Sequence, residues 1–216
     1  MKLYGFFRSS CSWRIRIALR YKGLSFTNIP IHLQRNGGEQ FSMEHQQRNP
    51  MAQVPVLEFN DPQHGLIVLS QSLAILEFLE ERFPKPSILP HNIVQRSRAR
   101  QIAEAINSGI QPLQNSSTLK RIEQIGEDKK EWARSWIQKG LDSIERMAKQ
   151  YPDTTFLASD TPSIADFCLI PQMFNARRFG CDTHQWRRLL QVEESCLVLP
   201  AFELSHPNKQ EDAPSR

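Results

Sequence analysis

The chain contains few cysteines, and these are far apart in the sequence. Only four occur in 216 residues, namely Cys11, Cys168, Cys181 and Cys196, and none belongs to a CxxC pair. This spacing disfavours both a disulfide framework and a cysteine-bound zinc ion. The six histidines show no HxH or HxxxH spacing either, and we therefore expect no metal site.

Long apolar runs are also missing. No stretch approaches the roughly 18–20 apolar residues that span a bilayer. The first residues lack the apolar core and the cleavage site of a signal peptide. We therefore expect a cytoplasmic protein without membrane contact.

The charge of the chain is mild and mixed in sign. The formal net charge is +4, and most basic residues are interleaved with acidic ones. This pattern is typical of a solvated surface, with attraction of small anionic substrates as a second interpretation. A basic stripe with interleaved aromatic residues, which is typical of nucleic-acid binding, is missing. We therefore expect no nucleic-acid partner.

The N-terminal part of the chain alternates between strand-like and helix-like patterns. Strands are predicted over residues 2–7, 26–31, 54–59 and 66–69, and helices over 10–22, over 39–48 and from residue 70 onward. A glycine stop follows the first helix, and turn residues separate the last two strands. The order β-α-β-α-β-β-α predicts a small α/β domain.

The composition then changes at a cluster of prolines. Pro84, Pro86 and Pro90 cannot continue a helix, and they predict a linker over residues 84–91. Beyond the linker, the apolar spacing predicts an all-α region.

Local signals refine this helical region. Long amphipathic stretches are predicted near residues 92–122 and 128–149, and Pro112 predicts a kink in the first. Ser163 and Asp166 have the spacing of a capping box at the start of a further helix. The polar tail from residue 206 to residue 216 is expected to be irregular.

Ser9-Ser10-Cys11 lies where the first strand ends and the first helix begins. Unpaired backbone N–H groups and the helix dipole favour an anion at that point, and a serine hydroxyl can add a hydrogen bond to a thiolate. Two plainer interpretations remain open: a serine that only caps the helix, and a cysteine that is only a small neighbour instead of a reactive thiol. Arg14 stands three residues after Cys11, so a dithiol oxidoreductase is disfavoured.

The segment from Ser9 to Leu19 resembles the SSCxWRxRIAL signature of zeta-class glutathione transferases and maleylacetoacetate isomerases. Further matches follow in order at residues 37–41 (GGEQF), 49–55 (NPMAQVP), 71–75 (QSLAI), 109–115 (GIQPLQN), 163–166 (SIAD) and 202–207 (FELSHP). The resemblance covers nearly the whole chain. The motifs NPMAQVP and QSLAI are shared widely among glutathione transferases, whereas the motif from Ser9 to Leu19 and GIQPLQN point to this class. It implies a thioredoxin-like domain over residues 1–83, the linker 84–91, and an all-α domain over 92–216 that contributes the second-substrate site.

The resemblance also implies a set of site residues. Ser9, Ser10 and Cys11 are the implied catalytic group, with Ser9 favoured over Ser10 as the hydroxyl that faces sulfur. The implied glutathione contacts are Ser9, Ser10, Cys11, Gln40, Val54, Gln71, Ser72, Gln111, Asn115, Ser116 and Ser117. Arg8 and Arg178 are the implied anchors for a dicarboxylate substrate, because guanidinium groups bind carboxylates through paired hydrogen bonds.

Several of these residues also have ordinary structural interpretations. Val54-Pro55 resembles the cis-proline corner of the thioredoxin fold, whereas a trans proline opening a strand is the alternative. Ser72 fits both a carboxylate contact and a helix cap. Without the resemblance, Gln40 and Arg178 would be interpreted as surface residues.

The implied activity is glutathione-dependent cis–trans isomerisation of maleylacetoacetate to fumarylacetoacetate, a step of aromatic amino acid catabolism. Maleylpyruvate isomerisation, α-haloacid dehalogenation and general glutathione conjugation are alternatives on the same scaffold. A non-catalytic, glutathione-binding regulatory protein is a further alternative from another class. By resemblance, we also expect a homodimer.

Overall fold

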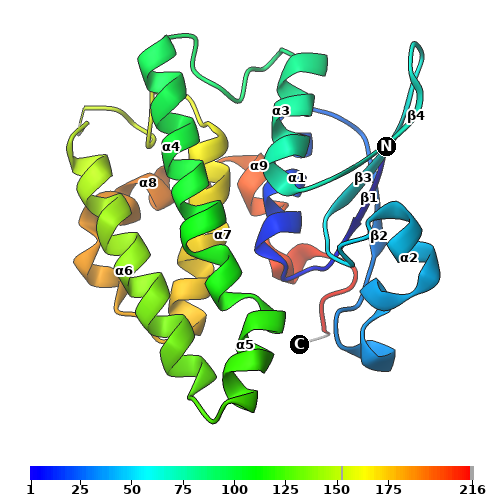
Figure 1. Cartoon of the computed structure of the whole chain (residues 1–216). Coiled ribbons are helices and arrows are strands. Elements are labelled where there is room, and N and C mark those ends of the chain that lie inside the picture. Colours follow the sequence, from blue (N-terminus) through cyan, green and yellow to red (C-terminus); the bar gives the residue numbers. More distant parts are fainter. Residues whose placement is uncertain (152, 215–216) are drawn as a thin grey trace. The chain divides into compact units, whose positions relative to one another are not determined.

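The computed structural model describes residues 1–151 and 153–214 (Figure 1). Contacts between residues divide the chain into two units. The first comprises Met1–Ser87 and the segment from Pro200 onward, and the second comprises Ile88–Leu199. The segment from Pro200 thus belongs with the N-terminal unit, in contrast to the predicted helical domain over 92–216. The reason is apolar packing, since Phe202 is fully buried and its helix lies against the first helix of the chain.

Among the described residues, four strands form the sheet of the first unit. They are β1 (Lys2–Gly5), β2 (Thr27–Pro30), β3 (Val56–Asp61) and β4 (Gly65–Ser70), in the order β2-β1-β3-β4. β1 pairs with β2 in parallel, whereas the β1–β3 and β3–β4 pairs are antiparallel. Leu3 and Val56 are fully buried in the two central strands. The mixed sheet confirms the predicted α/β, thioredoxin-like class.

The first unit contains α1 (Ser10–Tyr21), η1 (Arg35–Gly37), η2 (Glu39–Phe41), α2 (Met43–Arg48), α3 (Ser72–Arg82), α9 (Pro200–Glu203) and η5 (Pro207–Lys209). α1 lies beside α3 and α9 (Figure 1), which explains why its side chains are buried nearly all round. The single helix predicted over 39–48 is two helices, because Ser42 is extended and caps α2 by accepting the His45 N–H. The tail contains the short helix η5, and its last two residues lie outside the described residues.

The second unit is helical, as predicted. It contains α4 (Ile93–Gly109), η3 (Gln111–Gln114), α5 (Ser116–Gln124), α6 (Lys129–Lys149), α7 (Ile164–Arg178), η4 (Thr183–Gln185) and α8 (Arg187–Leu197). The stretch predicted near 92–122 is not one helix. It breaks at Pro112, where the kink was predicted, because Pro112 lies in the 3-10 turn η3 and Asn115 is extended. Ile110 is buried at this break, where an added Cβ on Gly140 of α6 would lie 2.4 Å from its Cδ1 atom.

α7 is the central helix of the second unit and runs alongside α4 (Figure 1). Most of its side chains are buried. The predicted cap is present at its start: the Asp166 carboxylate accepts the Ser163 N–H at 2.8 Å and the Ser163 hydroxyl at 3.0 Å. Across the described parts of the chain, no helix has both the length and the hydropathy that crossing a membrane requires.

Candidate functional site

The turn between β1 and α1 carries the serines predicted to face sulfur. Ser9 is the N-cap of α1, and its hydroxyl oxygen accepts the Ser12 N–H at 3.2 Å. A hydroxyl has one proton and two lone pairs, so capping through a lone pair leaves the Ser9 O–H able to donate to an anion. The structural and functional interpretations of Ser9 are therefore compatible.

The neighbours of Ser9 differ in exposure. Ser10 is the first residue of α1 and is 7% exposed, whereas Cys11 is a partly exposed free cysteine in the same turn. The Arg8 guanidinium lies 5.7 Å from the centroid of the Phe7 ring. Close approach of β1 and α1 depends on Gly5, because a Cβ there would lie 3.1 Å from the Ser12 side chain.

A fully buried arginine joins this turn to the start of α3. Arg14 Nη1 donates to the Ser72 hydroxyl oxygen at 3.0 Å, and Ser72 is 3% exposed. Ser72 is the first helical residue of α3, so it does not cap the helix. The role of Arg14 was missed by sequence reasoning, although a charged residue inside an otherwise apolar helix face was the available signal.

Gln71 precedes Ser72 in a strained backbone conformation, with φ of 70° and ψ of 111°. A non-glycine residue in such a region costs on the order of 1–3 kcal/mol and marks functional sites. Its side chain is exposed and makes no cap hydrogen bond. This strain is consistent with a ligand-gripping role, which stays a prediction.

Glycine at position 71 relieves this strain, and alanine retains it. We expect Gln71→Gly to be more stable than Gln71→Ala, with an unfolding free energy about 1 kcal/mol higher. This figure allows for the greater unfolded-state entropy of glycine. Both variants lose the carboxamide and should weaken glutathione binding equally. Urea unfolding and glutathione titration measure the two effects separately. Equal stability of the two variants would contradict the strain.

The loop before Val54 is held by two side chains that sequence reasoning did not select. The Gln53 carbonyl oxygen accepts from Asn49 Nδ2 at 2.9 Å and lies 3.0 Å from His45 Nε2. His45 and Asn49 are 1% and 2% exposed. The Val54–Pro55 peptide bond is cis, as predicted. The Asn-Pro start of the NPMAQVP motif was the signal for Asn49.

Gln40 is buried rather than on the surface, with 8% exposure. Its Nε2 atom donates to Leu33 O at 3.4 Å, and its Oε1 atom is buried with no hydrogen-bond partner among the described residues. Gly38, with φ of 110°, makes room for this amide, since a Cβ there would lie 2.6 Å from Gln40 Nε2. A buried amide with an unmet hydrogen bond suits a polar ligand.

The predicted contacts Gln111, Asn115, Ser116 and Ser117 lie in the second unit, but not on its first long helix. Gln111 opens η3, and the two serines open α5. Asn115 is the N-cap of α5, and its Oδ1 atom accepts the Ser117 N–H at 3.3 Å. The break at Pro112 thus gives these residues structural roles, and their contact with glutathione stays a prediction.

The two arginines at the end of α7 differ in their partners. Arg177 donates to both carboxylate oxygens of Glu193, at 2.6 and 2.5 Å. Arg178 is exposed, donates to Asn175 Oδ1 at 3.5 Å and lies 4.8 Å from the Phe179 ring centroid. The role of Arg178 as a carboxylate anchor stays a prediction.

Comparisons with known proteins agree with this picture. The family model described as glutathione S-transferase, N-terminal domain, matches residues 8–82. The maleylacetoacetate isomerase of Rattus norvegicus is 44% identical over 99% of this chain and 95% of that protein. A solved maleyl pyruvate isomerase, described as a bacterial zeta-class glutathione S-transferase, has a TM-score of 0.91 at 34% identity, with 99% of this chain and 100% of that chain covered.

A further solved structure is the maleylacetoacetate isomerase of Anaeromyxobacter dehalogenans, with dicarboxyethyl glutathione and citrate in its active site. Its TM-score is 0.87 at 40% identity, with 99% of this chain and 93% of that chain covered. The match to the family model defines the class as glutathione transferase, and the sheet topology and the serine-capped first helix are consistent with it. Within that class, the chain belongs to the family of zeta-class glutathione transferases and maleylacetoacetate isomerases. The resemblance drawn from the motifs is confirmed.

Proposed function

We propose that the chain catalyses the glutathione-dependent cis–trans isomerisation of maleylacetoacetate to fumarylacetoacetate. The observation that carries the proposal is the Ser9 hydroxyl. Its oxygen caps α1 by accepting the Ser12 N–H, so its O–H can donate a hydrogen bond to an anion. Family membership supports the reaction, and the glutathione derivative and citrate in the A. dehalogenans relative support an anionic substrate beside glutathione.

The residues of the first unit fit a bound tripeptide. Gln40 has a buried oxygen without a partner, Ser72 is fixed by Arg14, and Gln71 is held in a strained backbone conformation. When bound, glutathione supplies a thiolate that adds to the activated double bond and leaves after rotation about the resulting single bond.

The chain's own residues act on charge and position. The Ser9 O–H and the N-terminus of α1 stabilise negative charge at sulfur. Arg8 and Arg178 bind the carboxylates of the substrate and oppose the charge that develops on its keto oxygen. Ser10 lines the same turn as Ser9, and Cys11 is a neighbour of the chemistry, open to oxidation or alkylation.

Turnover with and without glutathione tests the proposal. We expect isomerisation of maleylacetoacetate to require glutathione, and a rate independent of glutathione would contradict the mechanism. Maleylpyruvate and an α-haloacid, assayed in parallel, rank the alternative reactions on this scaffold. Binding to immobilised glutathione without turnover of any maleyl compound would favour the non-catalytic regulatory alternative.

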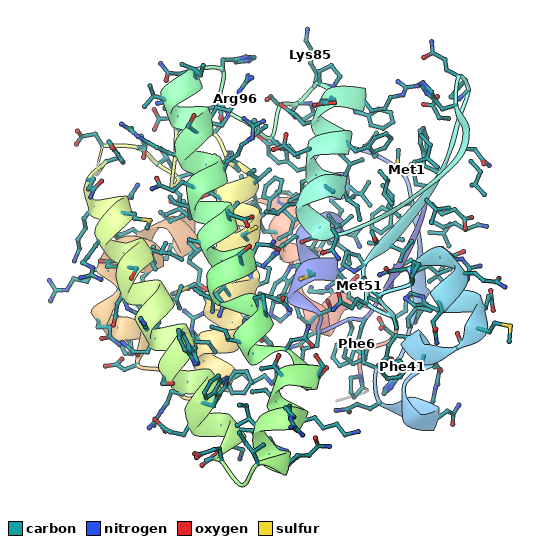
Figure 2. The ribbon with its side chains drawn as sticks, viewed as in Figure 1. Met1, Phe6, Phe41, Met51, Lys85 and Arg96 are labelled. Carbon is teal, nitrogen blue, oxygen red and sulfur yellow. The ribbon has the colours of Figure 1, made fainter. Side chains whose placement is uncertain are left out.

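A homodimer, a cytoplasmic location and a place in aromatic amino acid catabolism belong to the same proposal. Support for self-association comes from Phe41, Met43 and Met51 of the first unit, which are 59%, 78% and 64% exposed. Figure 2 labels Phe41 and Met51. Contiguous exposed apolar surface is typical of interaction sites. Light scattering should give twice the chain mass of 25.0 kDa, and the monomer mass at micromolar concentration would contradict the dimer.

A further inference from the structure

The peptide groups around Phe7 are held by charged side chains on both sides. The Phe7 N–H donates to Asp212 Oδ2 at 2.9 Å, and the Phe7 carbonyl oxygen accepts from Arg16 Nη2 at 2.7 Å. Phe7 follows Phe6, which Figure 2 labels, and lies beyond the last residue of β1. The sheet therefore does not fix its orientation, whereas Asp212 and Arg16 do.

Arg16 is fully buried and joins this turn to the C-terminal tail. Its guanidinium also donates to Phe6 O at 3.4 Å and to Ser205 O at 3.3 Å. Burial lowers the pKa of Arg16 to about 9, and the nearby charge of Asp212 opposes this effect. The guanidinium is therefore charged at neutral pH, and a buried charge requires acceptors and a counter-charge. The turn and the tail supply both.

The tail is held in place by its own contacts within the first unit. The His206 ring packs edge-on against Trp13 of α1, with centroids 5.3 Å apart. Gln210 Nε2 donates to Leu204 O at 3.1 Å and to His206 O at 2.8 Å. These contacts bring Asp212 to the turn that precedes Ser9, although Phe7 and Asp212 are 205 positions apart in the sequence.

We propose that Asp212 and Arg16 are positioning residues that orient the turn from Phe7 to Ser9 and thereby direct the Ser9 hydroxyl to the glutathione sulfur. The inference rests on the proposed function. Ser9 depends on this turn directly, since its N–H donates to Phe6 O at 3.0 Å. Rotation of the Phe7 peptide would change the entry into α1, whereas Gln40 and Ser72, the predicted tripeptide contacts, have hydrogen-bond partners outside this turn.

Replacement of Asp212 tests the proposal without removing the buried guanidinium. We expect Asp212→Ala to lower kcat about tenfold and to raise the apparent pKa of the bound glutathione thiol by about one unit, because one unit corresponds to a tenfold change in ionisation. The KM for glutathione should change less than about twofold, because the change leaves the side chains that bind the tripeptide in place. Asp212→Asn keeps an acceptor for the Phe7 N–H and loses the charge, so its values should lie between those of the wild type and Asp212→Ala.

The neighbouring exposed residue gives a matched control. Glu211→Gln also removes one tail carboxylate and should retain the wild-type kcat and thiol pKa. Ultraviolet absorbance of the thiolate on the glutathione complex measures ionisation independently of any maleyl substrate. If the wild type turns over no maleyl compound, the proposed function is wrong. The pKa of the bound glutathione thiol, measured by ultraviolet absorbance, still tests whether Asp212 positions the turn.

A merely structural role for Asp212 predicts a different result. In that case kcat falls only in proportion to the folded fraction seen in urea unfolding, and the pKa of the bound thiol does not move. That outcome in folded Asp212→Ala or Asp212→Asn protein would overturn the proposal. A raised thiol pKa in the variants, with glutathione affinity retained, would support it.

Discussion

Ser9→Ala is expected to lower kcat by about 100-fold, because loss of one preorganised hydrogen-bond donor to a negative charge in an active site typically has an effect of this size. The Ser9 oxygen accepts the Ser12 N–H at 3.2 Å, so its proton is the part that an anionic sulfur would use. The same change removes the cap of α1 and should cost about 0.5–2 kcal/mol of unfolding free energy. Steady-state kinetics and urea unfolding separate these two losses.

Two further serine variants sharpen this test. Ser42 caps α2 with the same 3.2 Å geometry, because its hydroxyl oxygen accepts the His45 N–H. Ser42→Ala should therefore lose similar stability with little loss of kcat. Ser9→Thr keeps both the cap and the O–H and should retain most activity. If neither Ser9→Ala nor Ser10→Ala loses more than about tenfold in turnover, the serine-assisted thiolate is wrong.

Asp166→Ala is expected to destabilise the second unit by roughly 3–5 kcal/mol, because it breaks a buried network. The carboxylate accepts the Ser163 N–H at 2.8 Å and the Leu157 N–H at 2.9 Å, and Asp166 is fully buried. Removal leaves two buried donors without acceptors. Asp166→Asn keeps one acceptor and should lose less, about 1–3 kcal/mol. Urea unfolding at several pH values measures these losses.

The pH dependence has a defined sign. Burial raises the pKa of Asp166 to about 6 in the folded protein, from an ordinary value of 3.8. The folded state therefore holds the proton more tightly, and the associated stability is present below pH 3.8 and is lost as the pH rises through 6. As the pH rises from 3.8 to 6, the difference in unfolding free energy between the wild type and Asp166→Asn should therefore shrink. A difference that stays constant with pH would contradict the raised pKa.

Asp128 provides the matched control in the same unit. It caps α6 by accepting the N–H groups of Lys130 and Glu131, and these hydrogen bonds lower the pKa of its exposed carboxyl. Its contribution to stability is therefore present above the unfolded pKa and is lost as the pH falls, which is the opposite direction to Asp166. Asp128→Asn should accordingly show its largest loss at neutral pH.

The local signals in the sequence were reliable where their causes are local. The serine cap before α1, the capping box at Ser163 and Asp166, and the prolines after α3 depend on neighbouring residues. The same holds for the element order of the first unit, which alternating apolar residues predict. Errors arose where one pattern covered two helices, as at Ser42 and at Pro112, because helical periodicity continues across a short break.

The sequence by itself determined the class of fold, the family and the turn that carries Ser9. Only the tertiary structure decided which charged groups support that turn. Arg14 is paired with Ser72 across 58 positions, and Phe7 is paired with Asp212 across 205. Burial makes each such partner necessary, since a charge or N–H group away from water must find an acceptor. A sequence pattern specifies the need for a partner, whereas only packing brings the distant partner to it.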